Sequence, residues 1–322
     1  MKRRLFLITA VLGIALHTTA YAAPVSFAYV PNHRSNSVSV IDTVKQAVVA
    51  TVPVGALPTD AVVNPAGTRA YIGNTDGFSV SVINTLNNRV IATIPLATQP
   101  YCLAINPQGT RLYVYGTANQ ISIVDTATNK VIGAIAMETG GYGMAVNAAG
   151  TRLYAANHST HNLAVIDTAT NAVLTTIPVG QDPNSVALGP DGKRVYVTSA
   201  TTISLTVIDT ASSSMLANTP VGSAAPLGGV AVNPLGTRVY VVSSEGMFAL
   251  DEAATTVVAT APVGPFPIGI DVNPQGTSIY VLNHYGTTVS VIDAVTYAVN
   301  KTITVGTNPI GHGRFIGPVV CR

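Results

Sequence analysis

Short apolar runs separated by polar turn residues recur along almost the whole chain. In one unit these runs are Met144–Asn147, Leu153–Ala156, Leu163–Asp167 and Val173–Val179, which we name a, b, c and d. They are rich in Val, Ile, Thr and Tyr and are bounded by Gly, Pro, Asn and Asp, the pattern of β-strands joined by tight turns. Because many runs are apolar on both sides, we expect sheets that are buried on both faces.

Two repeated positions fix the period of this pattern. A Tyr in strand b recurs at Tyr29, Tyr71, Tyr113, Tyr154, Tyr196, Tyr240 and Tyr280. An Asp or Asn at the end of strand c recurs at Asp42, Asn84, Asp125, Asp167, Asp209, Asp251 and Asp293. The second series is spaced by 41 or 42 residues, which is typical of β-propeller blades. The sequence therefore predicts an all-β, seven-bladed propeller of four-stranded antiparallel blades.

The ends of the repeat predict how the ring closes. Strand d carries Pro in most units, and Pro cannot donate to a strand ladder, so we expect d at the outer edge and a at the channel. The first repeat begins with a b strand at Ser26–Val30, whereas the last segment, Ile310–Ile316, has the pattern of an a strand. We expect this C-terminal inner strand to pair with the N-terminal strands and complete the seventh blade.

The N-terminus has the pattern of an export signal. Lys2, Arg3 and Arg4 precede an apolar stretch that ends in a small-x-small cleavage site at Ala20-Tyr21-Ala22. We interpret residues 1–23 as a signal peptide and residues 24–322 as a single propeller domain. This interpretation places the protein in the periplasm, outside the cell or on the cell surface. No later segment is long and apolar enough to predict a transmembrane helix.

The net charge limits the kinds of partner that the protein can bind, and the two cysteines raise the question of a disulfide. Without its three basic leader residues the chain has 13 basic and 14 acidic residues, so its net charge is about −1 and nucleic-acid binding is not expected. An oxidising compartment permits a disulfide between Cys102 and Cys321, although we expect the two to lie toward opposite faces of the ring. We expect a monomer without a cofactor, whose partner is a protein, a glycan or a small ligand of the cell envelope.

Several runs resemble the repeat of a known family. Leu112-Tyr113-Val114, Tyr154-Ala155-Ala156-Asn157 and Val165-Ile166-Asp167-Thr168, followed by Thr176-Ile177-Pro178-Val179-Gly180, are similar to the YVTN β-propeller repeat. The resemblance extends from Ala28 to Pro318. It implies an exported or surface-layer protein with seven blades, and many members of the family have no known enzymatic activity. The fold also resembles propellers of lactonases and of redox carriers.

Strand alternation predicts two unlike faces. The a–b and c–d turns, nearly identical between blades, share one face, which we call the turn face. The variable b–c and d–a loops share the other, which we call the loop face, and binding groups gather on such loops. The candidate site residues are His33, His284, His312, Asp60 and Asp271. Three of these are histidines that could form a metal or acid–base cluster, and Asp271 needs a partner because its neighbours are apolar.

Three hypotheses of function remain open at this point. The first is a non-enzymatic scaffold that binds its partner on the loop face. The second is a lactonase- or lyase-type enzyme with a metal at the channel mouth, and the third is a redox propeller that carries a cofactor.

Overall fold

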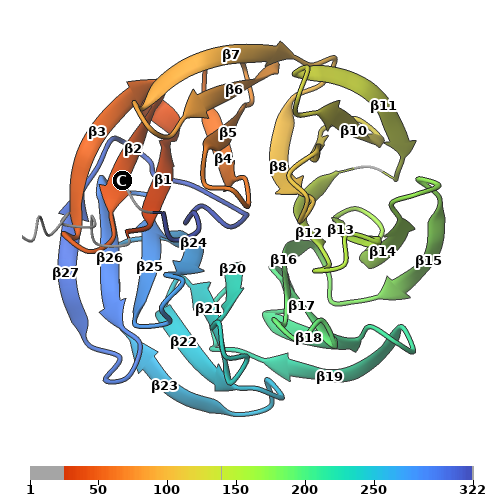
Figure 1. Ribbon diagram of the computed structural model, residues 1–322. Coiled ribbons are helices and arrows are strands. Elements are labelled where there is room, and N and C mark those ends of the chain that lie inside the picture. Colours follow the sequence, from red (N-terminus) through yellow and green to blue (C-terminus); the bar gives the residue numbers. More distant parts are fainter. Residues whose placement is uncertain (1–24, 139, 321–322) are drawn as a thin grey trace, which may run out of the picture.

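Seven antiparallel sheets stand side by side around a central channel and close into a ring (Figure 1). A computed structural model describes residues 25–138 and 140–320. Within these ranges the one helical element is a short 3-10 turn, η1 (His33–Ser35). The arrangement confirms the predicted seven-bladed all-β propeller.

Each blade is built from consecutive strands that run from the channel outward. Blade 1 contains β1 (Phe27–Asn32), β2 (Ser37–Asp42) and β3 (Ala47–Pro53). Blade 2 contains β4 (Pro58–Val63), β5 (Arg69–Asn74), β6 (Ser79–Asn84) and β7 (Arg89–Pro95). Blade 3 contains β8 (Pro100–Ile105), β9 (Arg111–Gly116), β10 (Gln120–Asp125) and β11 (Lys130–Ala136). Blade 4 contains β12 (Gly141–Val146), β13 (Arg152–Asn157), β14 (Asn162–Asp167) and β15 (Val173–Pro178).

The second half of the ring repeats the same order. Blade 5 contains β16 (Pro183–Leu188), β17 (Arg194–Ser199), β18 (Ser204–Asp209) and β19 (Ser214–Pro220). Blade 6 contains β20 (Leu227–Val232), β21 (Arg238–Ser243), β22 (Gly246–Asp251) and β23 (Val257–Ala261). Blade 7 contains β24 (Pro267–Val272), β25 (Ser278–Asn283), β26 (Thr288–Asp293) and β27 (Val299–Thr304).

The core lies between neighbouring blades. All seven repeated tyrosines of the second strand are buried. Two of them also reach the next blade through their hydroxyls: Tyr280 donates to the carbonyl of Thr43 at 3.1 Å, and Tyr196 donates to that of Glu252 at 2.8 Å. Burying an apolar side chain of this size stabilises the fold by about 2 kcal/mol. The repeated Tyr is thus a packing element that fastens one blade to the next.

The outermost strands carry a bulge at the same position. In β7, Val90 pairs with Ile83 and Ala92 pairs with Val82, so Ile91 has no partner residue in the ladder and faces solvent. In six blades this exposed bulge residue is apolar: Val49, Ile91, Ile132, Leu174, Leu216 and Val258. Together with the predicted edge prolines, the bulges disturb the free edge of each blade and so discourage pairing with another chain.

The C-terminal segment completes blade 1, as predicted, but not as one continuous strand. Among the described residues it pairs with the first strand and its flank through three isolated bridges, which are Val25↔Val320, Ala28↔Ile316 and Asn32↔Pro309. Between the last two bridges, residues 311–314 leave the ladder and turn into the channel. The expected strand over Ile310–Ile316 is therefore interrupted, because side chains of the inner strands bind its backbone amides in place of β1.

The predictions about the signal peptide and the disulfide involve residues that the structure does not describe. The predicted signal peptide, residues 1–23, and Cys321 lie outside the described residues. Cys102, the third residue of β8, is a buried free thiol. Within residues 25–138 and 140–320, no helix has the length and hydropathy needed to cross a bilayer.

Candidate functional site

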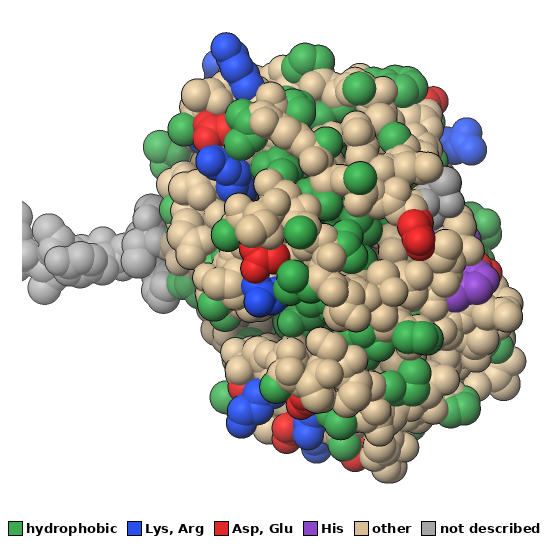
Figure 2. Space-filling model, turned by 90° about the vertical axis from the view of Figure 1, so that its right-hand side faces the viewer, with side chains coloured by type: hydrophobic (Ala, Val, Ile, Leu, Met, Phe, Trp, Pro, Cys, Tyr) green, Lys and Arg blue, Asp and Glu red, His purple; other side chains and the backbone are tan. Residues whose placement is uncertain are grey.

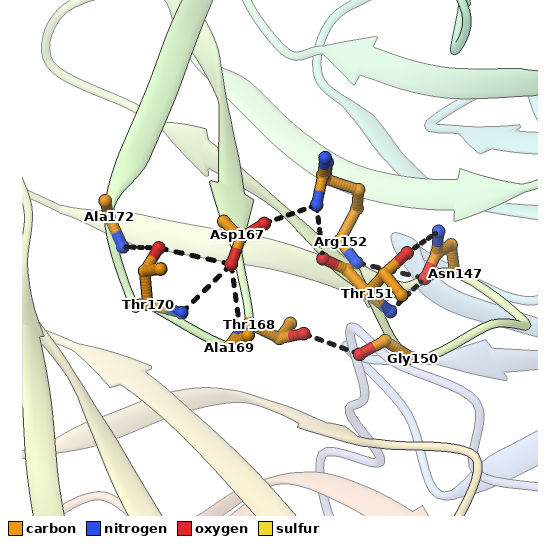
Figure 3. Close-up of polar contacts among 9 residues, drawn as sticks. All are labelled: Asn147, Gly150, Thr151, Arg152, Asp167, Thr168, Ala169, Thr170 and Ala172. Carbon is orange, nitrogen blue, oxygen red and sulfur yellow. Dashed lines mark hydrogen bonds and ion pairs between the residues drawn. The ribbon is translucent and has the colours of Figure 1, made fainter.

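Polar side chains of the turn face form hydrogen bonds that stabilise the turns (Figure 3). In blade 4, Asn147 Oδ1 accepts from the amides of Thr151 and Arg152 at 2.8 and 3.0 Å. Asp167 Oδ1 accepts from the amide of Thr170 at 2.9 Å, while its Oδ2 accepts from Arg152 Nη1 at 2.6 Å. These bonds to backbone amides lower the pKa of Asp167. The repeated Asp, Asn and Arg of this blade are therefore structural.

The same bonds recur in other blades. Asn side chains at the start of the a–b turn accept from later amides of that turn at Asn64, Asn106, Asn233 and Asn273. A Thr after strand c donates to the carbonyl of the turn glycine at Thr85, Thr126 and Thr210. Figure 2 shows, on the side of the molecule it draws, that most Lys and Arg side chains gather at one end of the ring and that the visible histidines lie at the other. The turn face is thus a repeated structural surface.

Two histidines of the loop face bridge neighbouring blades. His33 Nδ1 lies 3.1 Å from the carbonyl oxygen of Pro58, and His284 Nδ1 lies 3.3 Å from that of Pro309. A carbonyl only accepts, so both Nδ1 atoms carry the proton, and in the neutral ring Nε2 is left as an acceptor. The two ring centroids are 6.3 Å apart. Burial lowers the pKa of His284, with His33 and Arg34 contributing in the same direction.

His312 lies in the part of the C-terminal segment that turns into the channel. Its backbone amide donates to Asp60 Oδ1 of β4 at 2.8 Å. Its carbonyl lies 3.5 Å from Ser185 Oγ of β16, which belongs to a blade across the ring. Residues 311–314, which we call the plug, therefore span the channel mouth. Burial lowers the pKa of His312 to about 4, with His284 contributing in the same direction.

Asp60 is a backbone-binding group for the plug. Its Oδ1 also accepts from the amide of Gly313 at 2.9 Å, and its Oδ2 accepts from the amide of Leu103 in the next blade at 2.8 Å. Burial raises the pKa of Asp60 to about 6, although these amide bonds oppose the change. The carboxylate joins blade 2, blade 3 and the C-terminal segment, and besides these backbone amides it interacts with the Cys102 thiol.

Asp271 has a similar task at the other end of the plug. Its Oδ2 accepts from the amide of Ile316 at 2.8 Å, so the partner that its apolar surroundings require is the closing segment. Burial raises the pKa of Asp271 to about 6, and the Arg314 guanidinium opposes the change. The two carboxylates that the sequence singled out are thus both engaged by the C-terminal backbone, and the described histidine–carboxylate ion pairs involve Asp182 instead.

Aromatic rings continue from these histidines around the channel mouth. The Tyr142 ring lies 5.2 Å from Tyr101, 5.1 Å from His158 and 5.9 Å from His312, centroid to centroid. In a second group of rings, His284 lies 5.4 Å from Tyr285, and it is close enough to His312 to help lower the pKa of the His312 ring. We call the set the aromatic track; it consists of Tyr101, Tyr142, His158, His312, His284, His33, Phe266 and Tyr285.

The track contains residues that the sequence reasoning missed. Tyr101 and Tyr142 are the second residues of β8 and β12, where the corresponding strands have Thr59, Asn184, Gly228 and Ile268. A departure from the repeat toward a large aromatic at this position is a signal that a comparison of the units can find. His33, His158 and His284 share one position of the repeat, just after strand b, whereas Tyr101 and Tyr142 do not stand out among the many structural Tyr residues.

Metal-binding geometry is not evident at the mouth. Among the described residues no group of three or more His, Cys, Asp or Glu side chains is spaced to hold a metal ion. The nearest approach of this kind is Asp182 Oδ1, which lies 3.8 Å from His158 Nδ1 and 3.7 Å from His161 Nδ1. The amide of Asp182 donates to the same His161 nitrogen at 3.2 Å, so that nitrogen is already engaged.

A hollow of about 260 Å³ lies away from the track, between blades 3 and 4. Arg111, Ile132, Gly133 and Asn171 contribute to its walls. A side chain at Gly133 would meet no atom within 4 Å, so the hollow exists where this blade lacks a side chain on its outer strand. Arg111 there is already paired with Asp125 at 2.6 Å. The hollow is a gap in packing beside structural turns.

Comparison with known proteins identifies the fold. No protein-family model and no curated protein sequence matches the chain. A hydrazine synthase structure from Kuenenia stuttgartiensis is similar over 89% of this chain and 99% of that chain, with a TM-score of 0.75 and 22% identity. A functionally unknown protein from Desulfotomaculum acetoxidans DSM 771 is similar over 92% of this chain and 98% of that chain, with a TM-score of 0.76 and 15% identity. At these identities the likeness shows the fold alone, which is that of a seven-bladed β-propeller.

Proposed function

We propose that the protein is an exported propeller of the YVTN-repeat type that binds its partner on the loop face. One observation carries this proposal: the aromatic track gathers around the channel mouth on the loop face. The polar side chains of the turn face, in contrast, are hydrogen-bonded within the turns. Convergent aromatic and polar groups on variable loops of a rigid frame are the usual composition of a binding surface.

The hydrogen bonds of the Asp60 and Asp271 carboxylates favour a binding function over metal-dependent catalysis. Asp60 and Asp271 lie on inner strands, β4 and β24, and backbone amides donate to both carboxylates. A metal-activated water needs ligands and a free base in mutual reach. His33 and His284 each have Nδ1 hydrogen-bonded to a carbonyl, which suits ligand contact through Nε2.

The test compares matched variants on the two faces. The mature chain, residues 24–322, is immobilised and incubated with the native cell envelope fraction, and the bound material is compared with that bound by Tyr142→Ala and Leu235→Ala. Leu235 is 82% exposed in a turn of the opposite face, so it matches for lost apolar surface. We expect retention to fall with Tyr142→Ala alone; equal retention by both variants would refute a loop-face site. Export is checked separately by N-terminal sequencing of the secreted form, which should begin near Pro24.

A further inference from the structure

The rings of the track offer stacking surface that is already ordered. Tyr285 is 65% exposed, and its ring stacks on Phe266 at 4.2 Å with an interplanar angle of 12°. Because the stack holds the exposed ring in place, a ligand that covers Tyr285 loses little side-chain entropy in binding. Aromatic faces of this kind bind apolar or C–H-rich ring faces.

Hydrogen-bond acceptors stand beside these rings. His284 is adjacent to both Tyr285 and Phe266, with centroids 5.4 and 6.5 Å away. Its Nδ1 is bonded to the carbonyl of Pro309, which leaves Nε2 as an acceptor in the neutral ring. His33 repeats the arrangement one blade further on. The site thus combines ring faces with acceptors that suit a ligand hydroxyl.

The charge of the loop face disfavours a polyanion. Its b–c and d–a loops contain four acidic residues, Asp76, Glu138, Asp182 and Glu245, and one arginine, Arg34, and the plug adds Arg314. Nucleic acids and acidic polysaccharides need the opposite balance. The plug also spans the mouth between Asp60 and Ser185, so a ligand lies across the face and not down the channel.

We propose that the aromatic track binds a neutral oligosaccharide, whose ring faces stack on Tyr285 and Tyr142 and whose hydroxyls donate to the Nε2 atoms of His284 and His33. This inference rests on the proposed loop-face binding function and names its ligand class. A chain of sugar rings matches the track because ring surfaces recur in both of its groups, Tyr101 and Tyr142 in one and Tyr285 in the other.

The experiment is affinity electrophoresis of the mature protein through gels that contain neutral polysaccharides, with xylan, mannan and β-glucan as probes and polygalacturonate as the acidic comparison. Isothermal titration with hexasaccharides of any retarding polymer follows. We expect Tyr285→Ala to weaken binding at least about tenfold, as truncation of an aromatic anchor does, and Tyr285→Phe to retain it because the ring face remains. Leu235→Ala should bind like the wild type.

Three results would overturn the inference: retardation by polygalacturonate alone, retardation by none of the polymers, or neutral binding that Tyr285→Ala leaves unchanged. Its failure can be told from failure of the proposed function. If Tyr142→Ala still abolishes retention of an envelope component while no neutral glycan retards the protein, loop-face binding stands and the sugar assignment falls. If the envelope test fails as well, both fall.

Discussion

The carboxylate of Asp60 accepts a 2.8 Å hydrogen bond from the backbone amide of His312, which lies 252 residues later in the chain. The same carboxylate binds the amides of Gly313 and Leu103. A buried side chain of an early blade therefore recognises the last segment by its backbone, and several predictions about stability and pH depend on this contact.

Removal of the Asp60 carboxylate should destabilise the protein. Asp60→Ala leaves three amides without their acceptor, and an unsatisfied buried donor costs about 1–3 kcal/mol, partly offset by loss of the buried charge. We expect a net loss of about 3 kcal/mol in the free energy of unfolding, measured by urea denaturation. The matched control is Asp76→Ala at an exposed acid, which should change stability by less than about 0.5 kcal/mol. Equal effects of the two variants would contradict the assigned role.

The Asp271 contribution should grow as the pH falls. Its folded pKa, about 6, is raised above the ordinary value of 3.8, so its stabilising effect is fully present below pH 3.8 and is lost as the pH rises through 6. The wild-type advantage over Asp271→Asn in free energy of unfolding should therefore be greater at pH 4 than at pH 7, by up to about 3 kcal/mol. An advantage that is constant between these two values would show that the carboxyl is not held in this state.

His312 should have the opposite pH dependence. Its folded pKa, about 4, is depressed below 6.5, so its contribution is present above pH 6.5 and is lost as the pH falls through 4. The stability of the wild type relative to His312→Gln should decrease by up to about 3 kcal/mol between pH 7 and pH 4. A ring that titrates near 6.5 in NMR spectra of the folded protein would contradict this prediction.

Substitutions at two glycines should destabilise the protein for different reasons, a steric clash at Gly143 and a left-handed backbone conformation at Gly192. A Cβ at Gly143 would lie 2.8 Å from the Ser185 Cα and the Val186 amide nitrogen, so Gly143→Ala should cost about 3 kcal/mol by forcing two inner strands apart. Gly192 has φ +70° and open space around it, so Gly192→Ala should cost only the left-handed conformation, about 1–2 kcal/mol. Thermal unfolding of both variants tests the order, which would have to be abandoned if Gly192→Ala were the more damaging change.

Cys102 should be unreactive in the native protein. It is buried, and burial raises the pKa of its thiol well above the usual range, with Asp60 contributing in the same direction. Because the thiolate is the reactive form, a thiol reagent such as DTNB should label the Cys321→Ser variant slowly in buffer and rapidly in urea. Rapid labelling without denaturant would refute the buried position.

Much of the fold follows from the sequence because each blade repeats the same local rules. The spacing of Tyr71 and Tyr113, the turn residues and the edge prolines each report a feature that every unit shares. The plug was not predictable in this way. It depends on Asp60 and Asp271, single departures from the repeat, binding backbone amides that carry no side-chain signal. His33 and His284 stand out in the sequence because they share one position of the repeat, whereas the role of Tyr142 follows only from its neighbours in space.

The three bridges between the chain ends also set the order in which the molecule can form. Ala28 and Ile316 are 288 residues apart in the chain, so β1 keeps a bare inner edge until the segment around Ile316 has docked. Contacts of such long sequence separation are slow to form, and an open edge invites pairing with other chains. Closure of the ring thus requires the segment around Ile316, and a chain cut before that segment would remain an open arc.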